Sequence, residues 1–411
     1  MATLPTDLIV DILSNLSPKI LCRFKCVAKS WNSLINDPNF IKFHYTKSLN
    51  STNPNLIICS DLLSIAEIPT NNHHALCFSD LDHPVKQLSN YPTVQFLGSC
   101  NGIICISDHF KKTYFLYNPH TKTHRLIPPV QSIIPDTMYV SIKTYDENAY
   151  QRVEHMIGFG FGFDLVSDDY KLLRVIECYE EGLRTGREVR LYSLKNDSWK
   201  MIDDDLNHYP NVAGDGVYYN GVLYFVVVNE NNMPMVKCFD LKTETFSLLK
   251  MFDYDSGFNC FKIFLAELSG CLCVMVNYLK RALNTRFGYK VVRADLWVRK
   301  NDSWFRLFII CDPMIQRLVL IRPIVYSKDG GRILLEFDGI SFFWYEWGNK
   351  KFEKVEATGL PPKPFDSYTV VGSLVSLGPD EKRLKGKNVT KKETHKKSSD
   401  SFLATGFKLR L

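Results

Sequence analysis

Two different patterns of apolar positions divide the chain. In the first 47 residues the apolar side chains recur every three or four positions, which predicts amphipathic helices. From about residue 50 onward they occur in short runs and alternations separated by Asn-Gly, Ser-Gly and Gly-Gly pairs, which is typical of strands and hairpins. The pattern therefore predicts an α+β multidomain chain, with a small N-terminal helical module followed by a large all-β domain.

The helical module is predicted to hold three or four short helices. The first follows Pro5-Thr6 and carries the apolar stripe Leu8, Ile9, Ile12, Leu13 and Leu16. Ser17 can cap a second helix that Pro18 opens. A third is expected to end before Asp37-Pro38, and a fourth short one would hold Phe40 and Phe43. Such short helices bury too little apolar surface to be stable alone, so the module is expected to need a partner.

The all-β region contains a weak internal repeat. An aromatic marker recurs six times with a mean spacing of about 53 residues, near the ~50 residues of a kelch-like propeller blade. The markers are Phe78, Tyr117, Tyr192, Phe239, Trp297 and Tyr345, and their counterparts seven residues later are Val85, His124, Trp199, Phe246, Trp304 and Phe352. This spacing predicts a kelch-like β-propeller of six degenerate blades. The segment Thr369–Leu377 is expected to add a last strand to the first blade and close the ring.

Domain boundaries follow from these patterns. We expect the helical module at 1–47, the propeller at 48–378 and a tail at 379–411, with an insertion around Gln131–Gln151. The segment Gly158–Phe163 alternates glycine with phenylalanine, which favours a tightly packed strand over a nucleotide-binding loop, since no helix start follows it.

Composition changes this picture only slightly. The chain has 411 residues, 45% of them hydrophobic, and no apolar run approaches the ~18 residues of a membrane helix, so no membrane insertion is expected. The N-terminus lacks the pattern of a secretory signal. The twelve cysteines lie mostly in apolar strings and are expected to be buried, reduced thiols.

The net charge of +6 is confined to the tail. Ten Lys/Arg and four Asp/Glu lie between Pro379 and Leu411, so the preceding residues balance to zero. No nucleic-acid partner is therefore expected, and the tail is predicted to be disordered. It is either a nuclear address, a segment for an acidic partner or a plain solvated end. The expected localisation is cytoplasmic and nuclear.

Catalytic and metal-binding patterns are not found. The sequence has no Gly-x-Ser-x-Gly elbow and no Cys-x-x-Cys pair, and His73-His74 and His120-x-x-x-His124 fall in predicted turns. We therefore expect no catalytic residue, no metal and no cofactor. A propeller enzyme that uses copper is the alternative, and it lacks a convincing set of ligands.

The helical module resembles the F-box motif. The resemblance runs without gaps through Leu4, Pro5, Asp7, Leu8, Ile12, Leu13, Leu16, Lys19, Leu21, Arg23, Phe24, Lys25, Cys26, Val27, Lys29, Trp31, Leu34 and Ile35. It departs at Ser17, where the family usually has the proline that here comes one residue later. The resemblance implies a non-catalytic subunit that binds the Skp-type adaptor of a cullin–RING ubiquitin ligase. The implied Skp-binding residues are Leu4, Pro5, Leu8, Ile9, Leu13, Leu16, Pro18, Leu21 and Val27, whereas Trp31 could serve either the core or the partner.

The remaining chain resembles the plant F-box-associated interaction domain. This resemblance rests on Gly98-Ser-Cys-Asn-Gly102, Asn118-Pro119, Gly160-Phe-Gly-Phe-Asp164, Asp168-Asp169-Tyr170-Lys171 and Ser193-Leu-Lys-Asn-Asp-Ser-Trp199. It implies recruitment of a protein substrate for ubiquitylation. Asp400–Leu409 resembles the tail of an immunity-restraining member whose targets are nucleotide-binding leucine-rich-repeat immune receptors. Alternatives are a self-incompatibility F-box protein that recognises ribonucleases, and a scaffold outside the ligase. Candidate target loops are Gln131–Gln151, Glu180–Arg187, Glu230–Pro234 and Tyr278–Tyr289.

Overall fold

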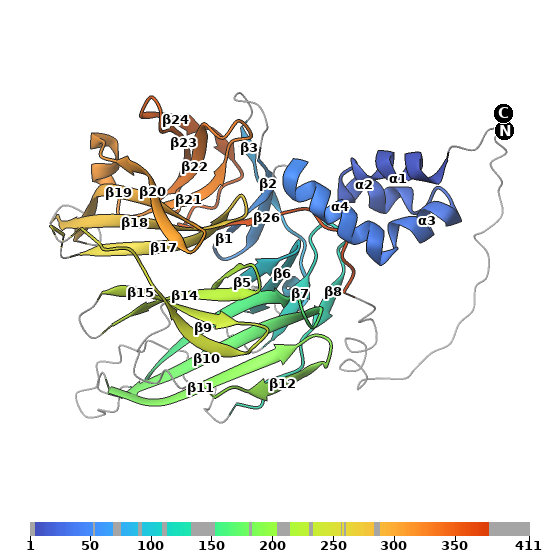
Figure 1. Ribbon diagram of the computed structural model, residues 1–411, viewed down its shortest axis with the longest axis horizontal. Coiled ribbons are helices and arrows are strands. Elements are labelled where there is room, and N and C mark those ends of the chain that lie inside the picture. The colour runs from blue at the N-terminus through green and yellow to red at the C-terminus, as the bar shows by residue number, and fades with distance from the viewer. Residues whose placement is uncertain are drawn as a thin grey trace, which may run out of the picture. The chain divides into compact units, whose positions relative to one another are not determined.

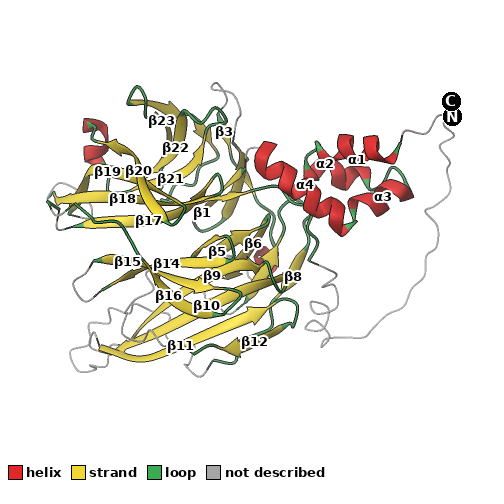
Figure 2. Cartoon of the chain, viewed as in Figure 1, coloured by secondary structure: helices red, strands yellow, loops and turns green. Residues whose placement is uncertain are grey.

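The computed structural model describes residues 5–51, 54–68, 75–88, 93–108, 113–132, 153–180, 183–203, 214–229, 233–255, 257–258, 260–282 and 288–377. Within these residues, helices are confined to the N-terminal end and to two short 3-10 turns, and the remaining regular structure is strand joined by loops and turns (Figure 2). Met1–Gly378 form one compact unit. The insertion expected at Gln131–Gln151 lies largely outside the described residues, as does the whole tail 379–411.

The four expected helices are present. They are α1 (Thr6–Ser14), α2 (Pro18–Phe24), α3 (Lys29–Ile35) and α4 (Pro38–Ser51). Ser17 occupies the N-cap position of α2, but its side chain makes no capping hydrogen bond, so the expectation about Ser17 is only half right. Asp37 does cap α4, because its Oδ1 accepts from Asn39 N at 2.8 Å. α4 is longer than predicted, and the expected boundary between residues 47 and 48 falls inside it.

Six four-stranded antiparallel sheets form the propeller in the described part of the chain (Figure 1). From the inner to the outer strand they are blade 1, β26 (Asp366–Val370), β1 (Asn55–Cys59), β2 (Leu63–Glu67) and β4 (Ser79–Asp80); blade 2, β5 (Val94–Cys100), β6 (Ile103–Asp108), β7 (Tyr114–Tyr117) and β8 (His124–Leu126); blade 3, β9 (Val153–Asp164), β10 (Asp169–Glu180), β11 (Leu183–Ser193) and β12 (Ser198–Met201). The others are blade 4, β13 (Val217–Tyr219), β14 (Val222–Val228), β15 (Pro234–Asp240) and β16 (Thr245–Leu249); blade 5, β17 (Phe261–Leu268), β18 (Cys271–Arg281), β19 (Tyr289–Lys300) and β20 (Ser303–Ile310); and blade 6, β21 (Ile321–Tyr326), β22 (Arg332–Phe337), β23 (Ser341–Glu346) and β24 (Lys351–Val355).

The six inner strands contact one another in sequence around a closed ring, from β26 through β5, β9, β13, β17 and β21 back to β26. Blades 1 and 6 are also joined by the parallel pair β3 (Leu76–Cys77) and β25 (Ala357–Thr358). The 3-10 helices η1 (Pro84–Gln87) and η2 (Pro313–Arg317) lie in connections between blades. The prediction of six blades is confirmed.

The closing strand differs from the prediction in its extent. It is β26, residues Asp366–Val370, and it pairs with β1 as the innermost strand of blade 1. Residues 371–377, predicted to continue this strand, are irregular instead. We call residues 371–377 the strap, because they follow β26 and contact both the helical module and the propeller.

The glycine–phenylalanine segment is a strand, as predicted. It forms the end of β9, where Phe159 and Phe161 are buried. A Cβ atom at Gly160 would lie 2.7 Å from Cζ of Phe225, and one at Gly162 would lie 2.4 Å from Cδ2 of Tyr218. Both glycines are therefore required for the close packing of blade 3 against blade 4.

The cysteines only partly follow the expectation. All twelve are free thiols, but Cys26, Cys77 and Cys311 are exposed. Burial raises the pKa of the Cys100 and Cys105 thiols well above the usual value, so these two remain protonated and unreactive.

Candidate docking surface on the helical module

The helices pack around a small apolar core. Leu13, Leu21, Ile35 and Phe40 are buried in it together with Leu374 of the strap. α4 is tied to α1 by polar contacts, in which Lys47 Nζ lies 3.1 Å from Asp11 Oδ1 and donates to Ser14 Oγ at 2.9 Å.

The outer surface of the same helices exposes large apolar side chains. Leu8 is 51% exposed, Ile12 55% and Val27 63%, and Ile20 is also exposed. Leu8 and Ile12 are four residues apart on α1, so they lie one turn apart on the same side. Large exposed apolar side chains that gather on one small module are typical of a protein-docking surface. We call Leu8, Ile12, Ile20 and Val27 the docking face.

The predicted Skp-binding residues divide into two groups. Pro5, Leu8 and Val27 are exposed, and Ile9 and Leu16 are half-buried; Leu13 and Leu21 are fully buried, Pro18 is buried against Gly372 of the strap, and Leu4 lies outside the described residues. Leu13 and Leu21 therefore support the fold of the free module. Their assignment to Skp binding, like that of the exposed residues, stays a prediction.

Two exposed apolar residues of the module, Ile12 and Ile20, were not among the predicted contacts. Ile12 was placed in the apolar stripe but not among the contacts, and Ile20 was not singled out. The available signal was the width of the stripe, because Leu8, Ile12 and Leu13 together span more than one side of a helix. Trp31 packs on the module's core, with its ring 5.4 Å from that of Phe24, which favours the core reading.

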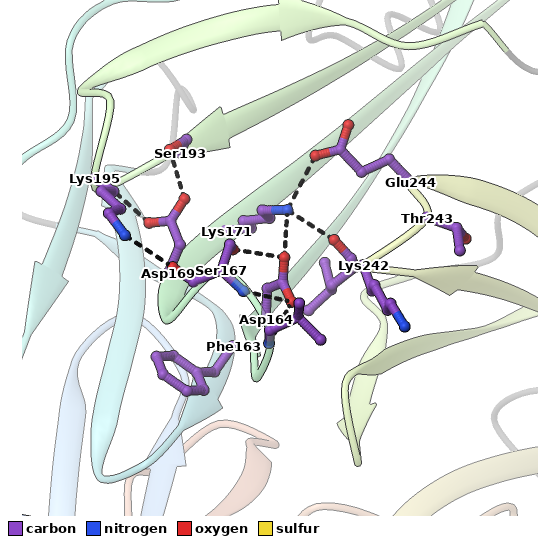
Figure 3. Close-up of polar contacts among 12 residues, drawn as sticks. Phe163, Asp164, Ser167, Asp169, Lys171, Ser193, Lys195, Lys242, Thr243 and Glu244 are labelled. Carbon is purple, nitrogen blue, oxygen red and sulfur yellow. Dashed lines mark hydrogen bonds and ion pairs between the residues drawn. The ribbon is translucent and has the colours of Figure 1, made fainter.

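A second candidate, the polar cluster at the Asp164 and Lys171 motifs, links two blades. Lys171 Nζ donates to Asp164 Oδ2 at 2.8 Å, to the Leu241 carbonyl at 2.7 Å and to Glu244 Oε1 at 3.0 Å (Figure 3). Ser167 Oγ also donates to Asp164, at 2.6 Å. Burial alone would raise the pKa of Asp164, but the hydrogen bonds from Lys171 and Ser167 lower it to about 2.

Among the described residues, the polar contacts of Lys171 are thus made with blade 3 and with the β15–β16 turn of blade 4. Asp169 accepts in the same way from Ser193 Oγ and from Lys195 N, which fixes the neighbouring turn (Figure 3). The cluster gives Asp164 and Lys171 a structural role as a tie between blades 3 and 4, and gives Asp169 and Ser193 a structural role within blade 3.

Neither a metal site nor a membrane span is found in what the structure describes. Among the described residues, no three or more His, Cys, Asp and Glu side chains gather in a way that could hold a metal ion. The described helices include none with the length and apolar character needed to cross a bilayer.

The chain belongs to the F-box associated beta propeller domain family. The model of that family matches residues 57–375, and the F-box domain model matches residues 1–43. F-box protein CPR1 of Arabidopsis thaliana is 29% identical, and the match covers 100% of both chains. An F-box/kelch-repeat protein of the same plant is 28% identical over 85% of this chain and 89% of its own length.

These matches confirm the two resemblances seen in the sequence. This is an F-box protein with a propeller domain, an organisation consistent with a substrate adaptor of an SCF ligase. The F-box domain implies partnership with Skp and a cullin, and F-box proteins are in general non-catalytic adaptors.

Proposed function

We propose that this protein is the substrate-recognition subunit of an SCF-type ubiquitin ligase. The observation that carries the proposal is an F-box that exposes Leu8, Ile12 and Val27 outward. In this role the F-box binds Skp through the docking face, and the propeller binds a protein target.

The mechanism is proximity, so the chain needs no catalytic residue of its own. A target held beside the charged conjugating enzyme presents its lysines at a high effective concentration, which turns a bimolecular encounter into a local one. The docking face supports this role, since full burial of a large aliphatic side chain contributes roughly 1.5–3 kcal/mol and about half of each side chain is still available for burial. Its residues act together toward an association cost on the order of 4–15 kcal/mol.

The target is proposed to bind at the end of the propeller opposite the strap. The strap contacts the β5–β6 and β7–β8 turns, since Gly102 lies against Ser373 and Asn118 donates to the strap carbonyls. Because adjacent strands are antiparallel, the connections between second and third strands leave from the other end.

Three of the predicted target loops are such connections, in blades 3, 4 and 5. They are partly strand rather than loop, because β10 runs to Glu180, β11 begins at Leu183, β18 runs to Arg281 and β19 begins at Tyr289. Residues 181–182, 230–232 and 283–287 of these connections lie outside the described residues.

The proposed target class is the nucleotide-binding leucine-rich-repeat immune receptor, which would make the protein a negative regulator of plant defence in the cytoplasm and nucleus. The support is the resemblance of the Asp400–Leu409 tail to that of the immunity-restraining member of the family. Ribonucleases of self-incompatibility are the alternative target.

Reconstitution with purified Skp, cullin and RING subunits tests the proposal. The full chain is expected to join the complex and to support ubiquitin transfer to a bound target, whereas Leu8→Asp abolishes both. A chain that binds Skp without supporting transfer would instead be a scaffold. Proximity labelling in plant cells with the ligase inactivated distinguishes the targets, because stabilised immune receptors and stabilised ribonucleases are different outcomes.

A further inference from the structure

The strap places side chains in two separate cores. Leu374 is 1% exposed and completes the core of the F-box, where it packs with Leu13, Leu21 and Phe40. Leu377, three residues later, is buried in the core between blades 2 and 3, and Val375 packs on the same core. One irregular segment of seven residues therefore belongs to both parts of the molecule.

The propeller holds the strap in a fixed position. Asn118 is fully buried, and its Nδ2 donates to the Ser373 carbonyl at 3.1 Å and to the Val375 carbonyl at 2.8 Å. Its Oδ1 accepts from His120 N at 2.9 Å, so the side chain joins the strap to the β7–β8 turn.

A glycine makes this approach possible. A Cβ atom at Gly102 would lie 2.2 Å from Cβ of Ser373 and 2.6 Å from the Val371 carbonyl oxygen, and Gly102 also has a φ of +76°. Gly102 and Asn118 belong to two of the motifs that identified the family, so the strap gives these motifs a structural role.

The F-box is in direct contact with the strap. Gly372 lies beneath Pro18, since a Cβ atom at residue 372 would be 3.1 Å from Cγ of Pro18. α1, α2 and α3 have only nine, seven and seven residues, and helices of this length are not stable in isolation. Leu374 enters their shared core from a position more than 330 residues away in the sequence.

From these contacts we infer that the strap is an integral part of the F-box: the closed propeller, by seating residues 371–377 against the helices, stabilises the conformation that binds Skp. This inference rests on the proposed function. Its consequence is that an N-terminal module, synthesised first, reaches its full affinity for the adaptor only after the last strand of the propeller has closed the ring. A chain that fails to complete its target-binding domain thereby joins the ligase less readily.

Binding of Skp to full-length variants tests the coupling. Leu374→Ala removes the side chain that fills the F-box core, and Leu374→Met conserves its volume. If only a fraction of the molecules has an ordered F-box, the apparent Kd for Skp rises by the inverse of that fraction. We expect Leu374→Ala to weaken Skp binding about tenfold or more and Leu374→Met to stay within about twofold.

Hydrogen exchange supplies the second readout. In Leu374→Ala the amides of α1 and α2 are expected to lose protection by a similar factor, while those of β14 and β15 keep theirs. Because linkage is reciprocal, saturating Skp should also slow exchange at the amides of Leu374 and Val375 in the unmodified chain.

Two outcomes overturn the coupling while leaving the proposed function intact. One is Skp affinity within twofold of the unmodified chain for both Leu374→Ala and Leu374→Asp, with Leu8→Asp abolishing binding. The other is an equal loss of protection in the helices and in blade 4, which would make the strap a general stabiliser. Retained Skp binding in Leu8→Asp would contradict the proposed docking face instead, whatever the Leu374 variants do.

Discussion

The docking face can be separated from the core of the F-box by paired alanine substitutions. Leu8 and Ile12 are about half exposed in the free protein, so Skp can bury only the remaining half of each side chain. Full burial contributes roughly 1.5–3 kcal/mol per residue, and the half still available amounts to about 1.5–3 kcal/mol for the pair. Leu8→Ala with Ile12→Ala should therefore raise the Kd for Skp about 10- to 150-fold.

The same double substitution should leave folding almost unchanged. Substitutions at exposed positions usually change the free energy of unfolding by less than about 0.5 kcal/mol, and alanine is a good helix former. Leu13→Ala has the opposite profile, because Leu13 is buried and its truncation should cost about 2–5 kcal/mol of stability. Titration calorimetry with Skp and thermal unfolding of each variant measure the two effects.

Leu165→Ala with Val166→Ala provides the matched control. These two apolar residues are at least as exposed as Leu8 and Ile12, but they lie in the β9–β10 turn of the propeller. Their replacement should leave the Kd for Skp unchanged. The reasoning is refuted if the Leu8/Ile12 variant binds Skp within twofold of the unmodified chain, or if the control weakens binding as much.

Three further predictions concern stability. Lys171→Met leaves Asp164 and Glu244 without their buried partner and should lower the free energy of unfolding by about 3–5 kcal/mol. Lys200→Met, at the exposed edge of the cluster, should lower it by under ~1 kcal/mol. Equal losses for the two variants in denaturant titrations would contradict this prediction. Burial, then Lys86, lowers the pKa of His83 to about 4, so the stability that neutral His83 provides is present above pH ~6.5 and is lost as the pH falls through 4. His83→Gln should flatten that pH dependence, and an unchanged slope would show that His83 does not titrate this way. Burial raises the pKa of Glu336 to about 8, although Arg322 opposes the shift, so the stability that its protonated form contributes is lost as the pH rises from ~4.5 to 8. The Glu336→Gln variant should therefore be more stable than the unmodified chain at pH 9 but not at pH 4. A gain at pH 4 and none at pH 9 would refute the assignment.

The repeat was readable from the sequence because the aromatic markers serve one structural purpose. Tyr117, Tyr192, Phe239, Trp297 and Tyr345 all lie in the third strand of a blade, and their counterparts lie in the fourth. Four of these pairs, including Tyr192 with Trp199, are direct cross-strand partners, a pairing that stabilises a hairpin locally. Because the two residues of each pair are seven positions apart in the sequence, the same spacing recurs from blade to blade and can be recognised in the sequence.

The first blade did not follow this rule. Phe78 lies between β3 and β4 rather than in a strand, and Val85 lies in η1. Blade 1 takes its innermost strand from the C-terminal end of the propeller, so its composition depends on a pairing between residues more than 300 apart. The sequence also predicted Leu374 within the closing strand, because its burial in the F-box depends on residues far away in the chain. No local pattern indicates that this side chain packs in the core of the F-box and not in the propeller.

The docking face shows a different limit. The periodicity identified the apolar side of α1, but a stripe this wide has an inner and an outer part. Leu13 packs inward, whereas Leu8 and Ile12 point to solvent. Which part turns inward is decided by the core that the strap completes, and that core contains Leu374, a residue outside the module.

The topology of the blades determines the distance between the end of the propeller that contacts the strap and the opposite end, which is proposed to bind the target. β9, β10 and β19 have twelve residues each, and a strand rises about 3.3 Å per residue, so the strands of blades 3 and 5 span roughly 40 Å between their two ends. The strap lies at the end with the β5–β6 and β7–β8 turns, and the connections proposed to bind the target leave from the other. Ubiquitin transfer by proximity requires this separation to stay constant, since a freely pivoting F-box would dilute the target over many positions. By anchoring Leu374 in the F-box and Leu377 in the propeller, the strap supplies the fixed connection that this mechanism needs.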